Sequence, residues 1–226
     1  MSLTPTASLP KLSGVPAPPH RVPSQDRRRQ LLEVAIDLFS RKGFSGTKTK
    51  DIAAAAGVSE AILFRHFATK EDLYHAILDT HEQRESSQWL DELRRLAERG
   101  DDLGFFRALV ANLLETFRKD PAFHRLMFYA ALEGHTFASL FHQRVGLPTF
   151  DFLQTYIAQR QKEGVFRRCD PRLAAIFALS VPIHYAMSRY VFSVKKMVFP
   201  HNDVVDEFAN FIWNGLRKPA SKTRKK

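Results

Sequence analysis

The residues best suited to a chemical task lie close together in the sequence, and that task is binding a polyanion. Lys48, Thr49 and Lys50 stand at the expected start of a short helix, where free backbone N–H groups already favour a negative charge. Arg65 can bind guanine or phosphate, and Lys70 follows where a backbone phosphate would pass. These residue types and spacings indicate a DNA-binding surface.

A helix-turn-helix would hold these side chains in place. Gly57 is expected to end a helix that starts at about Thr47 or Thr49 and runs to Ala56, and Ser59 is expected to cap the next helix. Two short helices joined at a steep angle by a glycine turn place the second one in the major groove of DNA.

The second helix has one face for packing and one for recognition. Leu63 and Phe67, four residues apart, are expected to face inward. On the other face, the small Ala61 would let the backbone approach the groove closely, and Ile62 could contact a thymine methyl group. His66 lies where a phosphate would pass.

The rest of the chain also has the spacing of helices. Leu32, Ala35, Ile36 and Phe39 form one helical face ahead of Gly43, which is expected to end a first helix. No alternating strand pattern is present, so we expect an all-α fold. Further helices are predicted near residues 70–98, 102–119, 121–132, 135–145, 147–163, 171–194 and 201–217.

The charge distribution supports the same interpretation. The chain of 226 residues has a net charge of +10. Residues 21–70 hold ten Lys/Arg against five Asp/Glu, and residues 217–226 hold six Lys/Arg and no acid, whereas residues 71–216 hold seventeen against nineteen. The basic excess therefore lies in the proposed DNA-binding segment, here called the reader, and in a tail. This is the distribution that binding to phosphate would require, although the charges of the tail could serve solubility alone.

Composition bounds the remaining functions. Residues 1–23 carry six prolines, and they and the basic stretch 219–226 are expected to be disordered tails. The lone cysteine, Cys169, excludes a disulfide framework and suggests a reducing cytosol. No apolar run is long enough to cross a membrane, no signal peptide is evident, and no motif of an enzyme, cofactor or metal site is found. Cys169 beside two arginines leaves redox sensing as a minor alternative.

Over about residues 25–75 the chain resembles the TetR (tetracycline repressor) family of bacterial transcriptional regulators. The resemblance rests on the segments LLEVAIDLFSRKGFSGT, DIAAAAGVS and LFRHFATKEDL, which occur in this order. It implies DNA contacts at Thr49, Lys50, Ser59, Glu60, Ala61, Ile62, Phe64, Arg65, His66 and Lys70. Where this chain has Phe64 the family usually has tyrosine, so one phosphate hydrogen bond is expected to be lost. Glu60 would repel phosphate, yet it could accept from a cytosine amino group.

The resemblance also implies a division of labour along the chain. Residues 24–70 would be the DNA-binding domain, and residues 71–218 a helical bundle for effector binding and dimerisation. A homodimer on double-stranded DNA predicts a palindromic operator with one reader on each half-site. The expected location is the bacterial cytoplasm, on the nucleoid when bound.

Phenylalanines are dense in the second part, which favours a cavity for a small apolar or aromatic effector over a plain packed core. Pro182 is expected to kink its helix beside one of the candidate lining residues. The candidates are Phe105, Phe123, His124, Met127, Phe128, His184 and Tyr185.

The last two long helices are expected to form the dimer interface, because each carries an apolar stripe at three- and four-residue steps. The stripes comprise Ile176, Leu179, Ile183, Met187, Tyr190 and Val194 in the first helix, and Phe208, Phe211, Ile212 and Leu216 in the second. The preferred function is a ligand-released repressor. An activator, a regulator that answers to a protein partner, and a nonspecific architectural DNA-binding protein remain as alternatives.

Overall fold

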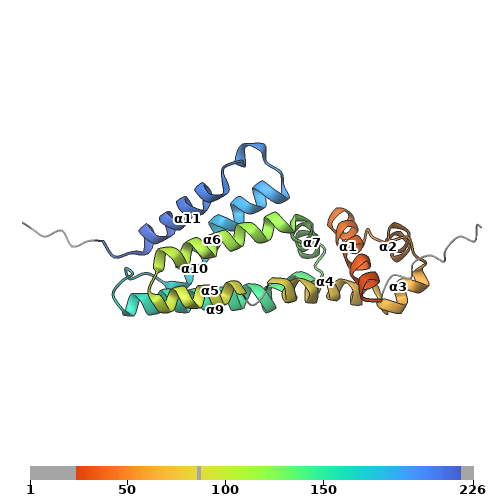
Figure 1. Cartoon of the computed structure of the whole chain (residues 1–226), viewed down its shortest axis with the longest axis horizontal. Helices are drawn as coiled ribbons and strands as arrows, with labels where there is room; N and C mark the ends of the chain where they lie inside the picture. Colours follow the sequence, from red (N-terminus) through yellow and green to blue (C-terminus); the bar gives the residue numbers. More distant parts are fainter. Residues whose placement is uncertain (1–23, 86–87, 220–226) are drawn as a thin grey trace, which may run out of the picture.

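The computed structural model describes residues 24–85 and 88–219, and this part of the chain is helical without an assigned strand, which confirms the predicted all-α fold. Figure 1 shows an elongated molecule with the three N-terminal helices at one end and a larger bundle at the other. The tails expected at residues 1–23 and 219–226 lie outside the described residues, except for Pro219.

The N-terminal part of the chain forms four helices: α1 (Ser24–Lys42), α2 (Thr49–Ala55), α3 (Glu60–His66) and α4 (Lys70–Glu85). Gly43 and Gly57 end α1 and α2 with φ angles of +71° and +66°, a conformation that glycine adopts without strain. The Ser59 hydroxyl accepts from the N–H of Ile62 at 3.4 Å and caps α3, as the sequence predicts. The turn at Gly57 and the cap at Ser59 therefore hold α3, the second helix of the predicted helix-turn-helix, at its predicted place.

The larger bundle contains α5 (Gln88–Arg99), α6 (Asp102–Lys119), α7 (Pro121–Leu132), α8 (Thr136–Phe141), α9 (Leu147–Lys162), α10 (Pro171–Ala186) and α11 (His201–Leu216). A π-helical turn η1 (His142–Gly146) joins α8 to α9, a second one, η2 (Met187–Val191), extends α10, and a short 3₁₀ turn η3 (Lys195–Met197) precedes α11.

Three predicted helices differ in the structure, and the one expected over 135–145 is α8 followed by the π-helical turn η1. The helix expected over 70–98 is assigned as α4 and α5, and residues 86–87 between them are not described. The helix expected over 171–194 ends three residues early, because η2 widens its last turn and Ser193 adopts a φ of +55°, which no α-helix allows. Pro182 lies inside α10, which continues through it to Ala186.

Buried side chains form two clusters, and α7 contributes to the first although it belongs to the bundle by sequence. The first cluster joins α1–α4 to four residues of α7 and α8, namely Phe123, Leu126, Ala130 and Phe137. The second fills the space among α5, α6, α9, α10 and α11. The core around the N-terminal helices therefore extends beyond residue 70 and depends on α7 and α8.

A buried polar contact joins α6 to α9 in the second cluster. The guanidinium of Arg160 donates to both oxygens of Asp102, at 2.6 and 2.7 Å, and the Tyr156 hydroxyl donates to the same carboxylate at 2.5 Å. Because the Asp102 charge is compensated by a bidentate partner, burying it is tolerable.

Candidate nucleic-acid interface and ligand cavity

The turn between α2 and α3 carries an unexpected side-chain contact. The Thr49 hydroxyl donates to Oε1 of Glu60 at 2.7 Å, so the first residue of α3 is tied to the first turn of α2. This hydrogen bond helps to fix the angle between the two helices. It also places a negative charge beside Lys48 and Lys50, the two exposed lysines that flank Thr49.

The outer face of α3 is composed as its spacing predicts. Leu63 and Phe67 are buried at 1% and 4% exposure, whereas Ala61 and Arg65 point to solvent. Phe64 is 44% exposed and is therefore accessible to a partner. The DNA contacts of this face stay a prediction.

Lys70, which is expected near a backbone phosphate of DNA, also makes contacts within the protein. Its ammonium group donates to the carbonyl of Phe44 and lies 4.0 Å from the centroid of the Phe44 ring. Burial lowers the pKa of Lys70. The side chain therefore braces the loop between α1 and α2, and a phosphate could reach it only by sharing the ammonium with Phe44.

Arginines at the start of α1 complete the basic surface, and sequence reasoning did not single them out. The guanidinium of Arg28 lies 4.8 Å from the centroid of Phe67, which places it near the end of α3. The pKa of His66 is lowered by burial and by the charges of Arg65, Arg28 and Arg27. His66 is therefore neutral at neutral pH, and the arginines carry the positive charge here. The run Arg27–Arg29 was the signal that could have identified them.

A cavity of about 340 Å³ lies within the bundle. Helices α4–α10 and η1 contribute lining residues: His81, Trp89, Asn112, Leu113, Thr116, Phe117, His124, Met127, Phe128, Ala131, Ala138, Phe141, Val145, Gly146, Thr149, Leu179 and Ile183. The π-helical turn η1 supplies Val145 and Gly146, and such turns are frequent at functional sites.

The structure brings three of the seven candidate ligand residues to this cavity, namely His124, Met127 and Phe128. The other four lie elsewhere. Phe123 is buried in the first cluster, and Phe105 is buried in the second, where its ring stacks on Tyr156 at 3.9 Å. Tyr185 packs against Phe208, and His184 is exposed on α10.

His124 is the most distinctive polar residue of the lining. Its ring stacks on Phe117 with centroids 3.7 Å apart, and its Nδ1 lies 2.8 Å from the carbonyl oxygen of Asp120 in the preceding turn. Burial lowers the pKa of His124, so the ring is neutral at pH 7. A carbonyl oxygen can only accept a hydrogen bond, which assigns the proton to Nδ1.

One helix connects this cavity to the N-terminal helices. α7 presents Met127 and Phe128 to the cavity, and the residues next to them in the sequence reach α1. The Tyr129 hydroxyl donates to the carbonyl of Arg41 at 3.2 Å. At the end of α7, the Glu133 carboxylate accepts from the backbone N–H groups of Phe44 and Ser45, at 2.9 and 3.3 Å.

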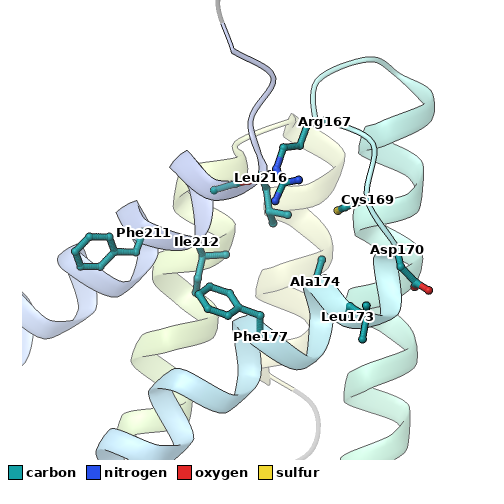
Figure 2. A pocket seen from close by; sticks show the side chains of 10 residues that line it. Arg167, Cys169, Asp170, Leu173, Ala174, Phe177, Phe211, Ile212 and Leu216 are labelled. Carbon is teal, nitrogen blue, oxygen red and sulfur yellow. Dashed lines mark hydrogen bonds between the residues drawn. The ribbon is translucent and has the colours of Figure 1, made fainter.

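The proposed dimer helices expose an apolar surface that differs in part from the predicted stripes. Leu173, Phe177 and Phe211 are 66%, 55% and 65% exposed and border a groove of about 360 Å³ between α10 and α11. Figure 2 shows Phe177 reaching from α10 toward Ile212 of α11, while Phe211 projects outward.

The predicted stripes are divided between the surface and the interior. Ile176, Phe211 and Val194 are exposed. Leu179 and Ile183 line the cavity, and Ile212 and Leu216 are buried. Met187, Tyr190 and Phe208 are half-buried against the second cluster. α10 is apolar around most of its circumference, so spacing alone could not show which side faces the core.

Other chemistry finds little support in the described residues. They contain no group of three or more His, Cys, Asp or Glu side chains placed to hold a metal ion. None of the helices that the structure describes is both long and apolar enough to cross a membrane. The Cys169 sulfur accepts from Nε2 of Gln161 at 3.2 Å, and no second cysteine exists in the sequence.

Comparison with known proteins places these features among regulators. The family model described as bacterial regulatory proteins, tetR family, matches residues 31–77. The chain is 30% identical over 162 residues to the transcriptional regulator RutR of Escherichia coli K12, covering 71% of this chain and 74% of RutR. It is 33% identical over 109 residues to the transcriptional activator FasR of Mycolicibacterium smegmatis, and this match spans only 48% of either chain.

A solved structure extends the likeness to the whole fold. The regulator AibR, solved in complex with isovaleryl coenzyme A and operator DNA, aligns with a TM-score of 0.65 at 21% identity. The alignment covers 83% of this chain and 98% of AibR. At this level of identity the similarity concerns the arrangement of helices alone.

Proposed function

Because this chain belongs to the tetR family of bacterial regulatory proteins, we propose that it is a homodimeric, sequence-specific repressor that a small apolar or aromatic ligand releases from a palindromic operator. Residues 24–70 read DNA, and residues 71–218 bind the ligand and the second subunit. One observation carries this proposal: α7 lines the cavity with one side and holds the loop after α1 with the other.

The reader places α3 in the major groove. Ala61 permits a close approach to the groove, and Ile62 and Arg65 contact base edges. Lys48 and Lys50, at the start of α2, bind the phosphate backbone of DNA. Arg28 adds a phosphate contact next to the end of α3, where Lys70 is already engaged with Phe44. Phosphate binding therefore depends more on arginine than the sequence suggested.

The exposed side chains of α10 and α11 form the dimer interface. Soluble monomers rarely expose several large apolar side chains side by side, and Leu173, Ile176, Phe177 and Phe211 are each about half exposed or more. A two-fold axis through this surface buries the same residues from both subunits. The same two-fold axis orients the DNA-binding domains of the two subunits toward the two inverted half-sites of the operator.

The ligand acts through α7. A molecule in the cavity displaces Met127 and Phe128, and α7 transmits this shift to the loop 43–45 through Glu133. The orientation of α2 and α3 then changes relative to the operator. A coupling of about 1–3 kcal/mol between the two sites is enough for regulation.

The relatives support a transcriptional regulator, and they bear on whether it represses or activates. AibR, by its description, was solved with an acyl coenzyme A and operator DNA together, which supports a ligand-responsive member of this fold. FasR is described as an activator, so activation by the same DNA-binding surface is the second candidate. A contact between this protein and RNA polymerase would distinguish an activator from a repressor.

The operator is tested by selecting bound sequences from random double-stranded DNA with the full chain. We expect an inverted repeat whose half-sites are recovered together, and a large preference over shuffled DNA of the same composition. Arg65→Ala should weaken binding, whereas Arg95→Ala, an exposed arginine on α5, should not. Equal affinity for shuffled DNA would replace this proposal with nonspecific architectural binding.

A further inference from the structure

Three polar side chains of the cavity donate protons to carbonyl groups of their own helices. The Thr149 hydroxyl donates to the carbonyl of Val145 at 2.9 Å, and the Thr116 hydroxyl to that of Asn112 at 3.0 Å. His124 does the same with Nδ1 toward Asp120. At Thr149 and His124, what remains for a ligand is lone pairs, because the proton is already in a hydrogen bond.

His124 is the best placed of these acceptors. Its proton is on Nδ1, so Nε2 carries a lone pair, and no hydrogen bond to Nε2 occurs among residues 24–85 and 88–219. The stack on Phe117 fixes the plane of the ring, and the bond to Asp120 fixes its rotation. A buried acceptor with a fixed direction discriminates strongly between ligands that donate and those that do not.

The charge of the lining side chains restricts the class of ligand further. The described lining contains no lysine, arginine, aspartate or glutamate, and its titratable members are His81 and His124. Their ring centroids lie 6.2 Å apart. A carboxylate or a phosphate in this cavity would be desolvated without a fixed cation opposite it, which opposes its binding.

Volume sets the scale of the molecule. An apolar cavity of about 150 Å³ accepts benzene, and this one measures about 340 Å³. Aromatic side chains at Trp89, Phe117, Phe128 and Phe141 surround it. The space therefore suits one or two rings, or a ring with a short chain.

We infer that the cavity binds an uncharged, mainly apolar molecule that carries a hydroxyl group, and that this hydroxyl donates to Nε2 of His124. The inference rests on the proposed ligand-binding function and names the chemical class of the ligand. His124 is thus a specificity-determining residue, and Phe117 and Asp120 are its positioning partners.

The test is calorimetric titration of the full chain with four matched probes: naphthol, its methyl ether, naphthoate and naphthalene. Phenol, anisole, benzoate and benzene form a smaller parallel series. We expect the hydroxyl compound of at least one series to bind about tenfold more tightly than its methyl ether, as one buried hydrogen bond predicts. The carboxylate should bind most weakly.

The variant His124→Phe keeps a ring on Phe117 and leaves the Asp120 carbonyl with the backbone N–H of residue 124, which lies 3.4 Å away in the native chain. It should reduce the preference for hydroxyl over ether to about one while leaving affinity for the unsubstituted ring nearly unchanged. His201→Phe, at an exposed histidine on α11, is the matched control and should retain the preference.

An ether or carboxylate that binds as tightly as the hydroxyl compound would overturn the inference, and so would a preference that survives in His124→Phe. If that variant fails to fold, the ratio measured on the native chain decides alone. No binding in either series would overturn the inference and the ligand cavity together. Probes that bind with the expected preference but leave operator affinity unchanged would refute only the proposed release mechanism.

Discussion

The contact between Glu133 and the loop after α1 allows a direct test of how the bundle communicates with the reader. Glu133→Ala removes the carboxylate that accepts from the N–H groups of Phe44 and Ser45. It leaves the Tyr129–Arg41 hydrogen bond in place, so α7 stays attached to α1 by a second contact. The variant therefore weakens the connection without removing it.

The magnitude follows from the geometry. Both hydrogen bonds are made to a charged acceptor, but Glu133 is exposed, so water competes for it and each bond is worth about 0.5–1 kcal/mol. The two together contribute about 1–2 kcal/mol, which is similar to an allosteric coupling of about 1–3 kcal/mol. We thus expect the variant to lose most of the response to ligand and to unfold at slightly lower denaturant.

Hydrogen exchange of the backbone amides is the assay that isolates this contact. The amides of Phe44 and Ser45 should exchange at least about fivefold faster in Glu133→Ala, while those within α6 and α9 should not change. Glu98→Ala, at an exposed glutamate on α5, is the control with the same chemical change. Unchanged exchange at Phe44 and Ser45 would refute the role assigned to Glu133.

Other substitutions test the reader, the interface and the cavity. Arg65→Ala should weaken operator binding about tenfold or more and flatten its salt dependence, and an unchanged salt slope in an anisotropy titration would contradict a phosphate contact. Phe64→Tyr should restore a donor and tighten operator binding about two- to tenfold with the salt slope unchanged. Phe211→Glu should produce a monomer at micromolar concentration in sedimentation, because it places charges on both sides of the two-fold axis. Burial lowers the pKa of His124 below its ordinary value of about 6.5, so the unfolded chain takes up this proton first as the pH falls. The free energy of unfolding should therefore decrease below about pH 6.5, and His124→Phe should remove that part of the decrease.

Local sequence signals predicted the reader well because local interactions determine it. Gly43 and Gly57 adopt the left-handed conformation that their positions require, and Ser59 caps α3 as expected. Leu63 and Phe67 are buried because a four-residue step keeps both on one face. Each of these outcomes depends on residues only a few positions apart.

The bundle was harder to predict because its contacts are distant in the sequence. Leu179 and Ile183 were assigned to the outer stripe of α10, yet they face the cavity. An apolar residue on a helix surrounded by apolar residues can pack against either neighbour, and only the tertiary arrangement decides. Lys70 shows the same limit, since its carbonyl partner Phe44 lies 26 positions earlier in the sequence.

The composition of the first core cluster determines how a ligand in the cavity could affect the DNA-binding helices. Phe123 and Phe137 are fully buried against the helices of the reader, although they belong to α7 and α8. Burial of such side chains stabilises by about 1.5–3 kcal/mol each, so the reader is not an independent body attached by a linker. A displacement of α7 by a ligand must then shift side chains inside the core of the reader. Close-packed cores respond to such shifts by moving as units. The proposed release mechanism therefore predicts that a ligand at Met127 changes the angle of α3.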